Sequence, residues 1–147
     1  MSLMNSLSIS ASGMDAQRAR LQALAENLAN AETTRTPGGG PYLRKDVVFE
    51  SSTLAGGSFQ DHFAAALDAP QLGVAVSEVR EDPQAVERRY QPGHPDADAN
   101  GYVAYPSIQP AEEMVNLQGA ARAYEANIAA MTVTKDMVRR SLELFRA

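Results

Sequence analysis

The stretch "PAEEMVNLQGAARAYEANIAAMTVTKDMVRRSLELFRA" (residues 110–147) repeats apolar residues at alternating intervals of three and four. This interval places the residues on one side of an α-helix. The leading proline and the acidic pair Glu112 and Glu113 are typical of a first helical turn. The stretch therefore predicts one long C-terminal helix. Its stripe has one polar member and consists of Met114, Leu117, Ala121, Tyr124, Ile128, Met131, Lys135, Val138, Leu142 and Phe145.

A second helical stripe lies near the N-terminus, between about residues 3 and 31. Ser10 and Gln17 interrupt one of its two rows, so the stripe is most regular toward its C-terminal half. The sequence "TTRTPGGGP" (33–41) then ends the helix, because proline and consecutive glycines are incompatible with a helix interior. The apolar residues of this stripe are Leu7, Met14, Leu21, Leu24 and Leu28.

Between the helices the sequence has short segments rich in β-branched and aromatic residues, at 46–50, 72–79, 86–90 and 102–105. Such segments, separated by turn residues, are typical of strands. Residues 59–68 have helical spacing and predict one short helix. We expect an α+β fold, in which long N- and C-terminal helices form a coiled-coil-like α domain and flank a small β-rich insert. The predicted segments are 1–36, 37–109 and 110–147.

Composition excludes several classes of function. The chain has 147 residues and a formal net charge of −5, which argues against nucleic acid as a partner. It contains no cysteine, so it forms neither disulfides nor thiolate metal sites. No apolar run reaches the roughly 18 residues of a membrane span. The N-terminal residues lack the features of a cleaved signal peptide, so any export is expected to use another route.

The segment "DADANG" (96–101) resembles the first half of an EF-hand calcium loop, with oxygen ligands at Asp96, Asp98 and Asn100 before Gly101. The twelfth position of that loop needs a carboxylate, and here it is Ser107. The flanking segments are also not helical. We therefore favour a turn in which Asp and Asn bond to their own backbone and glycine supplies a positive φ.

Other candidate sites are also weak. His94 lies beside acidic residues, but a zinc site needs further ligands, so a loop histidine is favoured. "PGGGP" (37–41) lacks the Lys-Ser/Thr of a phosphate-binding loop and is interpreted as a linker. Glu26, Glu112 and Glu113 are interpreted as helix-end or surface carboxylates. Since no nucleophile and base can be paired, we expect no enzymatic activity and no cofactor.

The two apolar stripes remain as the candidate functional surface. A single helix, or two helices packed only on each other, buries too little apolar surface to be more than marginally stable. Further burial is then expected to come from other subunits. The predicted assembly interface consists of Leu7, Met14, Leu21, Leu24, Leu28, Met114, Leu117, Tyr124, Ile128, Met131, Val138, Leu142 and Phe145.

Four motifs resemble one known family. "ALAENLANAETTRT" (23–36) is similar to the N-terminal signature of the bacterial flagellar rod and hook proteins, with Asn27, Ala29, Asn30 and Thr33 at the signature positions. "GPYLRKDVVFE" (40–50), "PGHPDADANGYVAYP" (92–106) and "EEMVNLQGAARAYEANIAAM" (112–131) resemble the proximal-rod members of this family. The motifs cover both ends and the middle of the chain.

This resemblance implies a structural subunit of the proximal rod of the flagellar basal body, which links the inner-membrane ring to the distal rod and hook. It implies helical assembly in the periplasm, after unfolded export through the flagellar type III apparatus without signal cleavage. The implied partners are copies of the chain, other rod proteins and the ring–rod junction protein, with no nucleic acid or small-molecule substrate. Asn27 and Asn30 are then expected at the helix exit, bonded to free backbone groups. A calcium-dependent binding module is the alternative.

Overall fold

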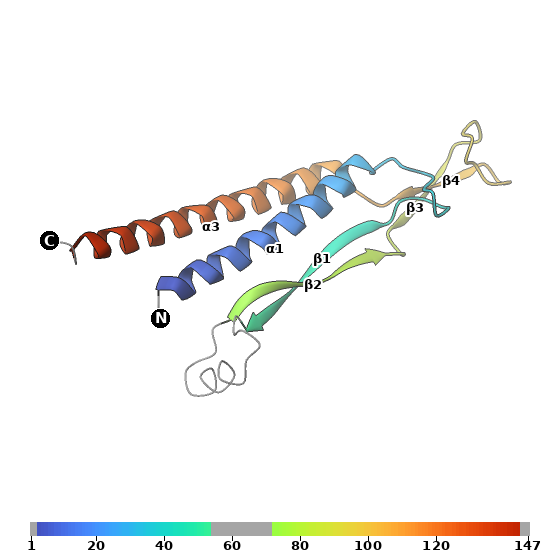
Figure 1. Ribbon diagram of the computed structural model, residues 1–147. Coiled ribbons are helices and arrows are strands. Elements are labelled where there is room, and N and C mark those ends of the chain that lie inside the picture. Colours follow the sequence, from blue (N-terminus) through green and yellow to red (C-terminus); the bar gives the residue numbers. More distant parts are fainter. Residues whose placement is uncertain (1–2, 54–71, 145–147) are drawn as a thin grey trace. The chain divides into compact units, whose positions relative to one another are not determined.

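The computed structural model describes residues 3–53 and 72–144 (Figure 1). Helix α1 spans Leu3–Ala29 and helix α3 spans Pro110–Leu144. Between them lie β1 (Arg44–Thr53), β2 (Leu72–Asp82), β3 (Val86–Tyr90) and β4 (Tyr102–Pro106). The α+β fold class and the predicted helix start at Pro110 are confirmed. The short helix predicted at 59–68 lies outside the described residues, as does Phe145.

The strands form two separate two-stranded sheets, β1 with β2 and β3 with β4. The arrows of β1 and β2 run in opposite directions (Figure 1). β3 and β4 are antiparallel, and their register pairs Val86 with Pro106 and Tyr90 with Tyr102. All four predicted strands are confirmed, with β1 and β2 longer than the apolar runs that predicted them. The strands extend because ladder hydrogen bonds continue past the apolar residues.

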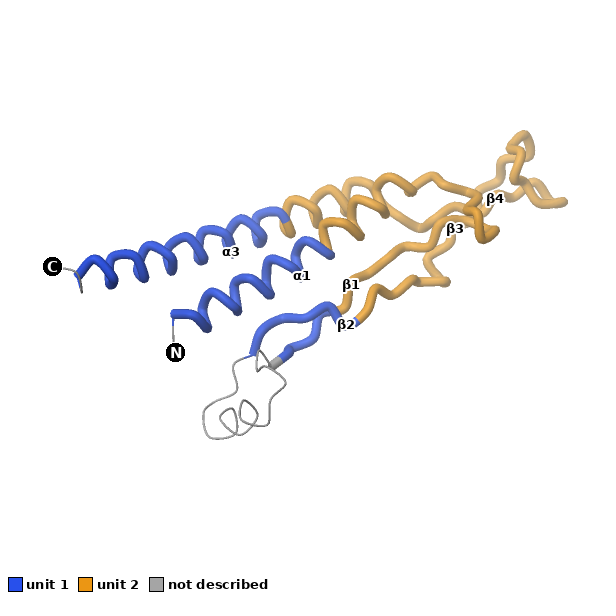
Figure 2. The backbone as a smooth tube through the Cα atoms, viewed as in Figure 1, with its two compact units in different colours: residues 1–19, 49–77, 121–147 blue, residues 20–48, 78–120 orange. Residues whose placement is uncertain are grey.

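The chain divides into two compact units (Figure 2). Unit 1 contains residues 1–19, 49–77 and 121–147, and unit 2 contains residues 20–48 and 78–120. The division crosses α1 after Ala19 and α3 after Ala120, so each unit has part of both helices and of the β1–β2 sheet. These units do not follow the three sequence segments, whose role as domains stays a prediction.

Apolar burial is concentrated in unit 2. Its buried apolar side chains are Ala23, Leu24, Tyr42, Val103, Tyr105, Ile108 and Ala120. Among the described residues of unit 1, Ala16 is the one buried apolar residue. Unit 2 therefore has a core of its own, whereas the described residues of unit 1 bury very little apolar surface. Neither α1 nor α3, over its described length, is apolar enough to cross a membrane.

Candidate functional site

A cluster of buried polar side chains in unit 2 is built around Asn27, near the end of α1. Asn27 is 0% exposed. Its Oδ1 accepts hydrogen bonds from the Tyr42 hydroxyl at 3.1 Å and from the Lys45 backbone N–H at 2.9 Å. Its Nδ2 donates to the Lys45 carbonyl at 2.9 Å and to Glu113 Oε2 at 3.4 Å. An amide is suited to this position because it has both a donor and an acceptor end.

Glu113 is the second centre of this cluster, and its placement corrects the sequence analysis. Glu113 is a helix-end carboxylate, as predicted, but it does not lie at the surface, because it is 2% exposed. Arg44 Nε donates to Glu113 Oε1 at 3.1 Å, so the buried charge is paired. Glu113 lies in the first turn of α3, so its carboxylate is also near the positive end of the helix dipole. We refer to Asn27, Tyr42, Arg44 and Glu113 as the buried polar cluster.

The remaining motif residues shape the turn that follows α1. Asn30 Nδ2 donates to the Glu26 carbonyl at 2.9 Å, and the same carbonyl accepts from the Asn30 backbone N–H at 3.0 Å. The Thr33 hydroxyl donates to Asn30 Oδ1 at 3.2 Å, and the Thr33 carbonyl accepts from the Tyr42 N–H at 3.1 Å. Ala29 is exposed at the last position of the helix. The turn thus returns the chain to the buried polar cluster.

An ion pair at the surface also joins the end of α1 to the start of β1. Lys45 Nζ lies 3.0 Å from Glu26 Oε2. The hydrogen bond from Lys45 lowers the pKa of the Glu26 carboxyl, and the same bond raises the pKa of the Lys45 ammonium. Both shifts favour the charged pair. Because both groups are solvated, the pair contributes little beyond orientation.

The predicted interface residues occupy different environments. In α1, Leu24 is buried and Leu7, Met14, Leu21 and Leu28 are half-buried. In α3, Leu117, Tyr124, Met131 and Val138 are half-buried, whereas Met114, Ile128 and Leu142 are exposed. The α3 side chains that face the chain's own interior include Glu113 and Ala120, one position before the predicted stripe. The stripe therefore lies partly beside the intramolecular contact and not at its centre.

In unit 1, the helices approach closely at Gly13 of α1 and Asn127 of α3. A Cβ atom at Gly13 would lie 3.0 Å from Asn127 Oδ1. Asn127 is held by a hydrogen bond from its Nδ2 to the Ala123 carbonyl at 3.0 Å. The sequence analysis missed both residues. A signal was present, because Glu113, Ala120 and Asn127 are seven residues apart, but this row is polar and small and was not weighed as a contact face.

The candidate calcium loop is a turn. Asp98 Oδ1 accepts from the backbone N–H of Asn100 at 2.8 Å and of Tyr102 at 2.9 Å. These hydrogen bonds lower the pKa of the Asp98 carboxyl, and the bond from the Tyr102 N–H has the larger effect. Gly101 has a φ of 80°, which favours glycine. The predicted turn is confirmed.

The neighbouring carboxylate of Asp96 is engaged in contacts to the segment after α1. It accepts from the Thr34 hydroxyl at 2.8 Å and lies 3.6 Å from Arg35. His94 Nδ1 accepts from the Asp96 N–H at 3.1 Å, and the imidazole ring packs edge-on against Tyr105 at 6.2 Å. These side chains hold the loop in place as structural groups.

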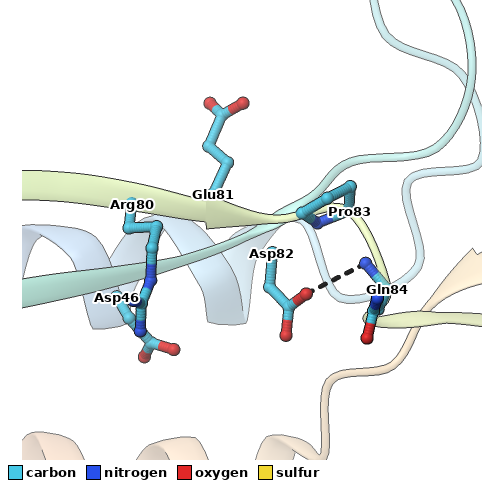
Figure 3. Close-up of a pocket in the computed structure, with 6 residues that line it drawn as sticks. All are labelled: Asp46, Arg80, Glu81, Asp82, Pro83 and Gln84. Carbon is cyan, nitrogen blue, oxygen red and sulfur yellow. Dashed lines mark hydrogen bonds between the residues drawn. The ribbon is translucent and has the colours of Figure 1, made fainter.

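An open pocket of about 290 Å³ lies beside the turn from β2 to β3 (Figure 3). The Asp82 carboxylate accepts from the Gln84 backbone N–H at 2.9 Å, which closes the turn. Asp82 and Asp46 point to one side of the strands and Glu81 points to the other (Figure 3). Among the described residues no group of three His, Cys, Asp or Glu is placed to hold a metal ion. The lining residues are Asp46, Arg80, Glu81, Asp82, Pro83 and Gln84.

Comparison with known proteins matches both helical regions to one family. A family model described as "Flagella basal body rod protein" matches residues 7–35, which contain Asn27, Asn30 and Thr33. A second, described as "Flagellar basal body rod FlgEFG protein C-terminal", matches residues 99–144 and thus α3.

Three relatives, each named flagellar basal-body rod protein FlgC, align along almost their whole length. The protein of Bacillus subtilis is 38% identical over 98% of this chain and 99% of its own. That of Borreliella burgdorferi is 34% identical and that of Aquifex aeolicus 39%, each over 99% of both chains. The chain therefore belongs to the FlgC-type family of flagellar basal-body rod proteins, the structural subunits of the rod in the bacterial flagellar basal body.

Proposed function

We propose that this rod subunit builds the proximal rod by packing its helices against neighbouring subunits in a helical arrangement. The neighbours are copies of the chain, other rod proteins and the ring–rod junction protein. The subunit then links the inner-membrane ring to the distal rod and hook. The observation that supports this most directly is that Met114, Ile128 and Leu142 are 53%, 43% and 59% exposed.

These three residues recur every fourteen positions, or two heptads, so they follow one side of a supercoiled helix. Single exposed apolar residues are ordinary, but a row along one helix side is typical of an interaction surface. Full burial of such a side chain contributes about 1.5–3 kcal/mol. Since each is already partly covered, neighbouring subunits would supply on the order of 1 kcal/mol per residue. Many such contacts together hold an assembly.

The small core of unit 1 supports the same proposal. Among its described residues, the large exposed apolar ones include Leu3, Met4, Val133 and Met137, and one apolar residue, an alanine, is buried. Such a composition leaves unit 1 marginal in a free chain, because few apolar groups leave water on folding. In the rod, neighbouring helices would complete its core.

The buried polar cluster supports a mechanical role for unit 2. A rod subunit that transmits rotation has to keep one shape under load. Four hydrogen bonds to a fully buried amide have to break together before α1, β1 and α3 separate in this unit. Buried polar networks of this kind favour one arrangement over alternatives, because any slip leaves charged and polar groups unpaired.

We further propose that the chain reaches the periplasm unfolded, through the flagellar type III export apparatus, without cleavage of a signal. Membership of the rod family supports this route, since a rod subunit leaves the cytosol before it assembles. The small core of unit 1 also lowers the free energy needed to unfold that part. We expect no enzymatic activity, cofactor, nucleic acid or small-molecule substrate, and the buried Glu113 and the half-buried Arg44 form a structural ion pair.

The test replaces Ile128 by aspartate in cells that depend on this chain for motility. A carboxylate in a surface that assembly covers would be buried without a partner. We expect loss of swimming and of the chain from isolated basal bodies, while the amount of exported chain is unchanged. Gln118→Asp, at an exposed polar position that is not a member of the stripe, is the control and is expected to swim. Normal swimming of the Ile128→Asp cells would contradict the proposal.

A further inference from the structure

A second row of residues, all but one of them apolar, runs along α3 in unit 1, apart from the predicted stripe. Its members follow one another at intervals of three and four, and all of them are exposed. Val133 lies about 120° around the helix axis from Asn127, at about 100° per residue, so the row is turned away from the contact with Gly13. We call it the outer stripe: Ala126, Ala129, Val133, Met137, Arg140 and Leu144.

An uncovered apolar face also lies on β2 in unit 1. Leu72, Val74 and Val76 alternate along the strand and therefore share one face, which we call the β2 strip. Their exposed fractions are 52%, 39% and 37%. The strand itself is fixed, because Gly73 is buried and the Val74 N–H donates to Ser12 Oγ of α1 at 3.2 Å. Alternating apolar residues usually mark a buried face, and here the chain's own described residues leave it open.

The two surfaces are complementary in length and charge. Val133 to Leu144 span about 16 Å along a helix, and Leu72 to Val76 span about 13 Å along a strand. The outer stripe includes Arg140. Among the described strand residues of unit 1, Glu50 is the one charged residue. An apolar row with a cation therefore has a counterpart in an apolar strip whose sheet contains one anion among the described residues of unit 1.

We propose that the outer stripe of one chain covers the β2 strip of a second copy. The inference rests on the proposed role in the rod and adds a specific contact to it. The two surfaces in contact are different, so two bound chains still have one free outer stripe and one free β2 strip. Further copies can therefore bind at both ends, and the arrangement extends from subunit to subunit. Three apolar residues on the β2 strip and five on the outer stripe are fewer than the 20–30 residues, or about 800 Å² per partner, of a stable interface. The contact therefore forms within the rod, beside the helix contacts, and not as a dimer of free chains.

Disulfide cross-linking tests the contact directly, because the chain has no cysteine of its own. Cells express two variants together, Val76→Cys and Met137→Cys, and isolated basal bodies are treated with a mild oxidant. A disulfide needs Cα atoms within about 7 Å, so it reports adjacency. We expect a disulfide-linked dimer from the mixture and at least a tenfold lower yield from either variant alone. Val74→Cys with Val133→Cys is a second pair in case one variant does not assemble.

The matched control pairs Val76→Cys with Arg139→Cys, at an exposed position in the same unit that lies about 160° around α3 from Met137, at about 100° per residue. It is expected to give no dimer above background. If the basal bodies contain both variants but neither pair gives more dimer than the control, the inference is wrong and the proposed function stands. Dimers from Val76→Cys alone would also overturn it, because they indicate a symmetric contact. If the chain is missing from basal bodies of motile cells, the proposed function fails and the inference with it.

Discussion

The amide of Asn27 and the carboxylate of Glu113 meet inside unit 2, with 3.4 Å between Nδ2 and Oε2. They come from α1 and α3, 86 positions apart, and each is at most 2% exposed. Tyr42 and Arg44 complete the hydrogen bonding of the pair from the segment that contains β1. The end of one helix and the start of the other are therefore joined through an amide and a carboxylate that are almost completely buried.

Replacement of Asn27 by alanine is expected to destabilise unit 2 by on the order of 3 kcal/mol. The change leaves the Lys45 backbone groups and the Tyr42 hydroxyl without a partner in a buried site, and each such loss costs about 1–3 kcal/mol. Urea unfolding of the free chain measures the effect. Asn100→Ala, an exposed position in the β3–β4 loop, is the control and is expected to change the unfolding free energy by less than about 0.5 kcal/mol. Equal effects of the two changes would show that the cluster adds no stability.

In the free chain, the amide hydrogen exchange rates are expected to change at the boundary between the two units, which lies inside each helix, and not at the helix ends. Amides at 20–29 and 110–120 should be protected with the rest of unit 2, because they share its core. Amides at 3–19 and 121–144 should exchange at least tenfold faster. From sequence alone, little protection is expected at residues 1–30 and 114–147, with protection concentrated at 42–106. Uniform exchange along each helix in a verified monomer would contradict a boundary inside the helices.

The glycines of the two helices are expected to respond differently to alanine. Gly119 has open space around its Cβ position, so Gly119→Ala should stabilise the helix by about 1 kcal/mol. Gly13→Ala should stabilise its helix by less, because the new methyl group would lie 3.0 Å from Asn127 Oδ1. If this contact is the cause, Gly13→Ala recovers the gain in an Asn127→Ala background. Exchange of unit 1 amides in the four chains of this double-mutant cycle measures the coupling. Absence of coupling would show that the approach is not rigid.

Alkaline pH is expected to weaken unit 2 through Tyr42. Burial raises the pKa of its hydroxyl above the ordinary value of 10.0, so the folded state keeps a proton that the unfolded state loses. The stabilisation is therefore complete below pH 10 and is lost as the pH rises through the folded-state pKa. The difference in unfolding free energy between the natural chain and Tyr42→Phe should shrink as the pH rises from 9 to 11. A constant difference would mean that Tyr42 does not titrate differently on folding.

Local patterns sufficed for the elements of this fold. Pro110 with the acidic residues behind it marks the start of α3, because it acts on the backbone within one turn. Helix α1 already ends at Ala29, so the glycines at 38–40 predict that the helix does not continue but do not set its last residue. The strand at 86–90 was predicted with the bounds that the structure shows. The turn at Asp98 was also predictable, since its hydrogen bonds reach no further than four residues. Such features depend on neighbours in sequence.

The environment of the stripe residues was not predictable in the same way. Leu117 and Ile128 belong to one sequence pattern, yet the first is half-buried and the second exposed. A heptad pattern shows which residues share a side of a helix, but not how far that side is rotated toward the partner. Here the closest contacts use a polar and small row, with Glu113 and Asn127, next to the large apolar one.

The sequence by itself determined the two helices, the four strands and the resemblance to the rod family, because helical spacing, turn residues and motifs are local properties. Only the tertiary structure decided that Glu113 is buried against Arg44 and Asn27, since the pairing joins residues far apart in the chain and a lone glutamate gives no sign of its partner. It also decided that the core lies in unit 2 while the apolar residues of β2 and of the outer stripe stay open. Burial depends on which surfaces a single chain can cover, and that is a property of the whole fold.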